Sequence, residues 1–157
     1  MQRVLARALA DEGQFAKAEE QASAVLAARR RQTSDPEGTG RTLLVLGGAL
    51  VELGKLDEAE PHLKEALTIF REHVPNRDAL AVQAANWLGA ITVARKAYPE
   101  AEALLLPDSD QFFTTAAKMS PNERRVAVGH IVKLYEAWGK PEQAAVWQKK
   151  LDALPKP

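Results

Sequence analysis

The sequence predicts an all-α protein built from about four antiparallel helical hairpins. A turn motif recurs four times at spacings of 41, 42 and 43 residues. Apolar residues recur at helical spacing on both sides of each turn. No segment is best explained as a β-strand, because even the apolar run LLVLGGALVELG contains a glycine pair and stays in register with the other copies. A period of this length is typical of repeat proteins, in which each unit packs mainly against its neighbours.

The turn motif aligns without gaps in LADEGQFAKAEE, LVELGKLDEAEP, TVARKAYPEAEA and YEAWGKPEQAAV. The turn position is occupied by Gly13, Gly54, Lys96 and Gly139, and the alanines five residues later are Ala18, Ala59, Ala101 and Ala144. Glycine suits this position because a residue with a Cβ loses roughly 1 kcal/mol or more in the left-handed conformation that ends many helices. We therefore expect a first helix to end at each turn and a second helix to follow it.

The four hairpins are expected at about 1–32, 40–74, 78–119 and 121–154. The apolar stripes of the first helices contain Leu5 and Leu9, then Leu43, Leu46 and Leu50, then Ala85 and Leu88, then Val128, Ile131 and Tyr135. The clearest second-helix stripes contain Phe15, Ala18, Ala22 and Val25 in the first hairpin and Leu56, Ala59, Leu63, Ala66 and Leu67 in the second. Stripes at this spacing indicate helices with one buried face.

Short polar segments separate the hairpins. They are TSDPEGTG at 33–40, HVPNRD at 73–78 and SPNE at 120–123. In the last of these, Ser120 can cap a helix, Pro121 suits its first position and Glu123 can complete a capping box, which predicts a helix from about Pro121.

The third hairpin departs from the pattern in two places. Lys96 stands where the other three copies have glycine. Pro107, followed by the polar residues at 108–110, is expected to break its second helix, which would restart through Phe112 and Phe113.

Composition excludes several classes of protein. The 157 residues are 46% hydrophobic and 27% charged, which is ordinary for one globular domain. The formal net charge is zero, so the whole chain has no field that would attract nucleic acid or an anionic membrane. Cysteine is absent and no apolar run approaches the length of a membrane-spanning helix. Because Arg3 and Arg7 interrupt a would-be signal core, we expect a cytoplasmic protein.

One ordered set of residues resembles a tetratricopeptide repeat. It consists of Leu46, Gly47, Leu50, Gly54, Leu56, Ala59 and Ala66. The period and the Asp-Pro and Pro-Asn-Arg-Asp linkers resemble the subclass with repeats of about 42 residues, found in kinesin light chains and bacterial signalling proteins. The resemblance covers essentially the whole chain, and it implies a single right-handed α-solenoid of about four hairpins over residues 1–157, acting as a non-catalytic protein-binding scaffold.

A second resemblance leaves an alternative open. The segment at 134–151 resembles the last repeat of arrays that follow the kinase domain in some bacterial Ser/Thr protein kinases. This implies a regulatory or oligomerisation array. The first hairpin starts without a capping segment, so we expect a longer repeat protein, and self-association through that uncapped hairpin.

The expected binding surface is the concave side, where first helices point residues away from their core stripe. By this register and by resemblance to the family, the groove residues are Arg3, Arg7, Arg41, Leu44, Val45, Gly48, Asn86, Trp87, Ala90, His130 and Lys133. Asn86 matches a groove asparagine that binds peptide backbone in the long-repeat subclass. Trp87 is either an apolar anchor beside it or a residue buried between helices. The cationic side chains favour an acidic or mixed-charge peptide.

Other chemistry is poorly supported. His62, His73 and His130 have no second histidine at metal-binding spacing, and no nucleophile is paired with a base, so we expect neither a metal, a cofactor nor catalysis. The glycines at 38–40 open a helix without the rest of a phosphate-binding loop. The run Arg29–Arg31 complements a helix C-terminus, and RNA binding through it is a distant alternative. We expect no specific nucleic acid and no membrane as partners.

Overall fold

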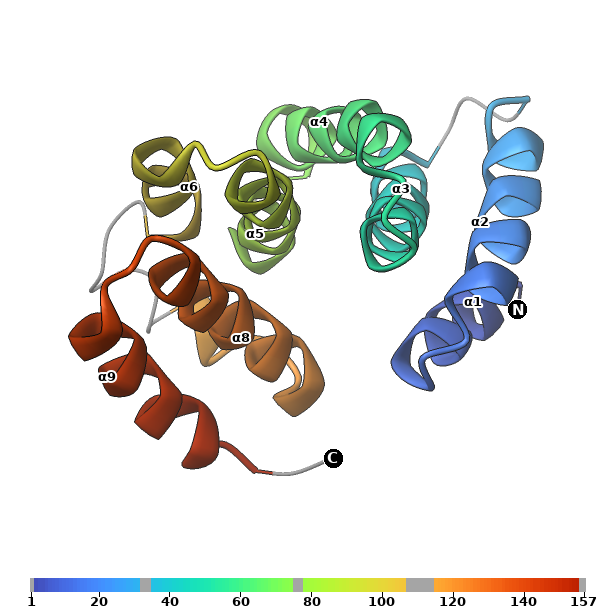
Figure 1. Ribbon diagram of the computed structural model, residues 1–157. Helices are drawn as coiled ribbons and strands as arrows, with labels where there is room; N and C mark the ends of the chain where they lie inside the picture. The colour runs from blue at the N-terminus through green and yellow to red at the C-terminus, as the bar shows by residue number, and fades with distance from the viewer. Residues whose placement is uncertain (1, 32–34, 75–77, 107–114, 156–157) are drawn as a thin grey trace. The chain divides into compact units, whose positions relative to one another are not determined.

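The computed structural model describes residues 2–31, 35–74, 78–106 and 115–155. Within these ranges regular structure is helical and no strand occurs, which confirms the all-α class. The helices are α1 (Gln2–Asp11), α2 (Phe15–Arg29), α3 (Pro36–Glu52), α4 (Leu56–His73), α5 (Asp78–Ala94), α6 (Tyr98–Leu105), α8 (Pro121–Ala137) and α9 (Pro141–Asp152). Figure 1 shows these helices with the same labels.

All four predicted turns have the same backbone geometry. Gly13, Gly54 and Gly139 have φ angles of 74°, 75° and 72°, and Lys96 has a φ of 62°. At each turn the amide of this residue donates to the carbonyl three residues earlier, and the next amide donates to the carbonyl five residues before it. This pair of bonds is the Schellman motif, which satisfies carbonyls at a helix C-terminus. The predicted positions of the turns and the antiparallel hairpins are therefore confirmed.

Lys96 adopts a left-handed conformation without being glycine, which predicts a stabilising substitution. Lys96→Gly is expected to raise the free energy of unfolding by about 1 kcal/mol, because it removes the steric cost of a Cβ at positive φ. Lys64→Gly, at an exposed position inside α4, should lower the free energy by about 1 kcal/mol instead. Urea unfolding of both variants measures whether each change in the free energy of unfolding is positive or negative. A loss of stability in Lys96→Gly would contradict this account of the turn.

The chain divides into two compact units, Met1–Trp87 and Leu88–Pro157, which we call the N-terminal and C-terminal units. In the N-terminal unit α2 packs against both α1 and α3, and α4 packs against α3. Small residues allow close packing there. A Cβ added to Gly47 would lie 2.5 Å from the Leu63 side chain, and one added to Gly40 would lie 2.7 Å from Phe70. The glycines of α3 therefore bring its backbone close to α4.

The start of α3 differs from the sequence prediction. The second hairpin was expected from about residue 40, but α3 begins at Pro36. Asp35 accepts a 2.7 Å hydrogen bond from the Gly38 amide, and proline occupies the first helical position. These two features begin a helix even though Gly38 and Gly40 have low helix propensity, because capping and packing against Phe70 outweigh that propensity.

In the C-terminal unit, α8 begins at Pro121 as predicted. Both bonds of the Ser120–Glu123 capping box are formed. Arg125 of α8 donates to the carbonyls of Leu151 and Leu154 at the end of α9, each at 3.2 Å. These hydrogen bonds thus connect the first part of α8 to the C-terminal end of α9.

The third hairpin is partly described. A Cβ added to Gly89 of α5 would lie 2.6 Å from Leu105 of α6, which repeats the contact between Gly47 and Leu63. Tyr135 of α8 donates a 2.7 Å hydrogen bond to the Glu102 carboxylate of α6. Burial is the larger cause, and this hydrogen bond the smaller, of a tyrosine pKa raised to about 12. The predicted end of the helix before Pro107 is confirmed, since α6 finishes at Leu105. The predicted break at 107–110 and restart through Phe112 and Phe113 lie outside the described residues.

Candidate functional site

The N-terminal unit contains a cavity of about 310 Å³ that is lined from three helices. Each of these helices, α1, α3 and α5, is the first helix of its hairpin. The lining residues are Arg7, Ala8, Asp11, Arg41, Leu44, Val45 and Leu80. Of the eleven predicted groove residues, Arg7, Arg41, Leu44 and Val45 are brought together here.

Helical periodicity explains how α3 lines the cavity. Arg41, Leu44 and Val45 are separated by three and four residues, so they share one face of the helix. Leu44 is 4% exposed, Val45 is 9% exposed and Leu80 of α5 is 6% exposed. Together with Ala8 they give the cavity apolar walls.

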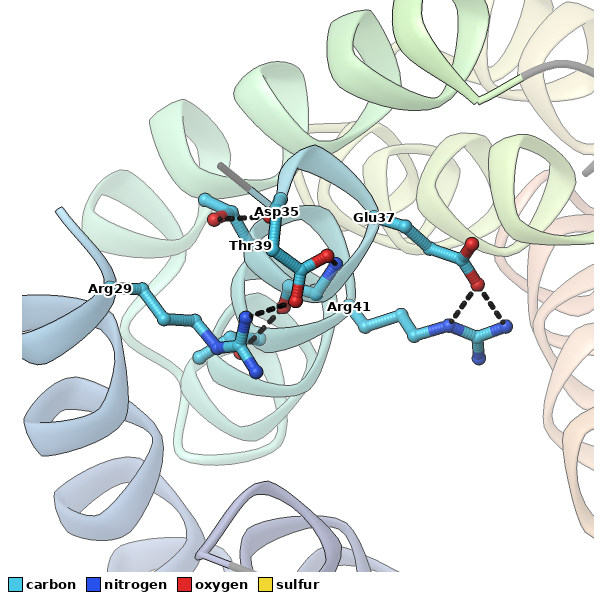
Figure 2. A network of polar contacts seen from close by, with 7 residues as sticks. Arg29, Asp35, Glu37, Thr39 and Arg41 are labelled. Carbon is cyan, nitrogen blue, oxygen red and sulfur yellow. Dashed lines mark hydrogen bonds and ion pairs between the residues drawn. The ribbon is translucent and has the colours of Figure 1, made fainter. Parts of the chain in front are cut away.

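Charged pairs stand at the same cavity. The Arg7 Nε atom lies 3.2 Å from both carboxylate oxygens of Asp11, and the Arg41 Nε atom donates at 3.0 Å to Glu37. About a third of each arginine side chain is exposed. Figure 2 shows the Glu37–Arg41 pair, one helical turn apart. Because each guanidinium has a carboxylate beside it, the cavity presents both signs of charge.

Trp87 of α5 packs on α3 next to the cavity. A Cβ added to Gly48 would lie 3.0 Å from the indole, so glycine leaves the space that the ring fills. The indole is partly exposed. Trp87 therefore packs on α3 while staying partly exposed, and its part in binding stays a prediction.

The remaining predicted groove residues lie in different environments. Asn86 is 3% exposed, and Gly48 is also buried. Arg3 lies in α1, and its side chain is outside the described part. Ala90, His130 and Lys133 belong to the C-terminal unit, where Ala90 is partly exposed and Lys133 is exposed. Their contribution to binding stays a prediction.

His130 is a buried titratable group of α8. It is 5% exposed, and burial, together with the charge of Lys133, lowers its pKa to about 3. The imidazole is therefore neutral in the folded protein over the physiological range. Its burial indicates a part in the packing of the C-terminal unit.

Sequence reasoning missed Ala8, Asp11 and Leu80 as cavity residues. Asp11 had a local signal, since it lies one helical turn after Arg7 and can pair with it. Ala8 and Leu80 had none, because their role depends on how α1 and α5 approach α3.

The basic run at the C-terminus of α2 takes part in structural ion pairs. The Arg29 guanidinium lies 2.6 Å from the Asp35 carboxylate that caps α3. Figure 2 shows this pair. Arg30 lies 3.2 Å from Glu65 of α4. These contacts favour the structural reading of the run over RNA binding. The Gly38 amide donates to the capping Asp35 carboxylate, which favours a structural role for the glycines at 38–40 over phosphate binding.

Across the described ranges, histidine and acidic side chains do not gather into a group of three that could hold a metal ion. None of the helices in these ranges combines the length and apolar character needed to cross a bilayer.

Comparison with known families agrees with the repeat geometry. The family model described as tetratricopeptide repeat matches residues 1–72. Residues 1–72 belong to the tetratricopeptide repeat family. This match spans α1 to α4, the two hairpins that supply six of the seven residues lining the cavity. Neither a curated protein nor a solved structure matches the chain.

Tetratricopeptide repeats generally mediate protein–protein interaction and typically serve as non-catalytic scaffold domains. The two remaining predicted hairpins show the same turn geometry at Lys96 and Gly139 as the matched repeats show at Gly13 and Gly54. The predicted tetratricopeptide repeat family is thus confirmed for residues 1–72, and the later described turns repeat the same backbone geometry.

Proposed function

We propose that the N-terminal unit is a scaffold module that holds a peptide segment of a partner protein at the cavity between α1, α3 and α5. The observation that supports this proposal is the convergence of three successive first helices on one cavity with apolar walls. A ligand site commonly combines such walls with a few polar groups that set orientation. In this proposal the chain is cytoplasmic and has no catalytic role.

The cavity favours a partner segment with an apolar anchor and charged flanks. Leu44, Val45 and Leu80 can bury an apolar side chain, while Arg7 and Arg41 can pair with carboxylates. Asp11 and Glu37 beside the arginines favour mixed charge over a uniformly acidic peptide.

Ala8→Trp tests the site, because Ala8 is exposed and the new indole can fill the cavity without disturbing the core. Peptides selected from a displayed random library on the wild-type chain should lose at least tenfold in affinity for Ala8→Trp. Ala24→Trp, at an exposed position of α2 outside the cavity, should bind them like the wild type. Fluorescence anisotropy measures both. Equal binding by the two variants would refute this site.

We also propose, as a second candidate, self-association through α1, as expected of a regulatory array such as that of a bacterial Ser/Thr kinase. Leu5 supports it. Its side chain is 49% exposed, whereas the residues at the same repeat position, Leu46, Leu88 and Ile131, are 3%, 7% and 0% exposed. A large apolar side chain at a normally covered position can contact a second copy.

Sedimentation equilibrium tests this candidate. The wild-type chain should form dimers at micromolar concentration, and Leu5→Glu should remain monomeric because a buried carboxylate would oppose contact. Val146→Glu, at a position 53% exposed in α9, is the matched control and should dimerise like the wild type. A monomeric wild-type chain would exclude self-association at that concentration.

A further inference from the structure

The cavity of the N-terminal unit offers little that could bind the main chain of a peptide. An extended segment presents amide and carbonyl groups on both edges, and these groups need hydrogen-bond partners when they leave water. Of the seven lining residues, Ala8, Leu44, Val45 and Leu80 have no polar side-chain atom. The two arginines donate only, and each already has a carboxylate beside it. The seventh lining residue, Asp11, is the acceptor, and both of its carboxylate oxygens already accept from Arg7.

Side-chain amides near the cavity are covered. Asn86 is 3% exposed and Gln83 is 8% exposed, both on α5. Leu44 and Asn86 occupy the same position in successive repeats, so α3 carries an apolar side chain where α5 carries an amide. A segment whose own backbone groups are already paired fits this surface better than one that needs new partners.

The apolar surface continues along α3 beyond the cavity. Gly48 lies one turn after Leu44, and the partly exposed Trp87 indole packs over it. One turn of helix advances about 5.4 Å. This step matches the distance between side chains at positions i and i+3 or i+4 of a partner helix.

The size and charge of the cavity agree with the same kind of occupant. Its volume of about 310 Å³ is at the low end of the roughly 300–1,000 Å³ range of ligand pockets, which suits one large side chain and not a whole peptide. Within each of the pairs Arg7–Asp11 and Arg41–Glu37, the two residues lie one helical turn apart on the same helix. A partner helix with acidic and basic residues flanking its apolar stripe complements both pairs.

We infer that the partner segment is an amphipathic α-helix of mixed charge, which places one large apolar side chain in the cavity and another against Trp87. This inference rests on the proposed function, because it assumes that the cavity is the binding site, and it specifies the conformation and chemistry of what binds there.

The test selects displayed random peptides about 20 residues long, or roughly 30 Å as a helix, on the full chain. Peptides that bind Ala8→Trp equally well are removed. The survivors should carry apolar residues at i, i+3 or i+4 and i+7. Proline at the centre of the best synthetic peptide should weaken binding at least tenfold, while proline in its first turn should have little effect.

The outcomes separate this inference from the function on which it rests. Peptides that depend on Ala8 but show alternating apolar residues and tolerate central proline would overturn the helix and keep the site. If no selected peptide distinguishes the wild-type chain from Ala8→Trp, both the site and the helix are refuted. Circular dichroism of the bound peptide provides a second readout, since the inference requires helix content to rise on binding.

Discussion

Lowering the pH from about 8 to about 4 is expected to remove roughly 3 kcal/mol from the free energy of unfolding through His130 alone. Burial lowers the pKa of His130 in the folded chain to about 3 from the ordinary value of 6.5. Between these two values the unfolded chain binds a proton that the folded chain does not. The contribution of neutral His130 is therefore complete above the unfolded pKa and is lost as the pH falls toward the folded pKa.

His130→Gln isolates this effect, because glutamine keeps a polar side chain without titrating in this range. Urea unfolding at several pH values should show a flatter acid limb in the variant than in the wild type, with a difference of roughly 3 kcal/mol between pH 8 and pH 4. Ala24→Gln, which changes an exposed residue that does not titrate, should keep the wild-type slope. Identical slopes for wild type and His130→Gln would show that His130 protonates equally in both states.

Gly47→Ala should destabilise the N-terminal unit by about 1–2 kcal/mol. Alanine favours a helix over glycine by about 1 kcal/mol, but its Cβ would lie 2.5 Å from the Leu63 side chain. Leu63 is fully buried and cannot swing away, so overpacking of about 1–3 kcal/mol exceeds the gain in propensity. Thermal and urea unfolding measure the net change.

Gly129→Ala is the matched control, because nothing lies within 4 Å of a Cβ added to that helical glycine. It should raise stability by up to about 1 kcal/mol, opposite in sign to Gly47→Ala. Leu63→Ala should cost roughly 2–5 kcal/mol alone, and Gly47→Ala added to it should then be neutral or stabilising. If Gly47→Ala lowered the free energy of unfolding equally in the wild type and in the Leu63→Ala variant, the contact between the two residues would be contradicted.

Residues close together in the chain decided much of what could be predicted. The turns at Gly13, Gly54, Lys96 and Gly139 and the capping box of Ser120 and Glu123 agree with the structure. Each is formed by hydrogen bonds within about six residues, so a short stretch of sequence contains all the groups involved. The sequence prediction placed the start of α3 too late, because Gly38 and Gly40 are weak helix formers although Asp35 caps the helix ahead of them.

The candidate site depended on contacts between helices. Helical register together with the family resemblance placed Arg7, Arg41, Leu44 and Val45 on the inner side of the repeats, and these four line one cavity. It did not show that Leu80 completes the cavity, because that depends on where α5 approaches α3.

The sequence by itself determined the helix ends, the hairpins and their register, since these follow from local hydrogen bonds and from the angular position of each residue on its helix. Only the tertiary structure decided which of those residues stay accessible. Leu5 is half exposed while Leu46, at the same repeat position, is buried, and Asn86 is covered while Arg41 is not. The physical reason is that periodicity gives the direction of a side chain, whereas its exposure depends on which other helix covers that direction.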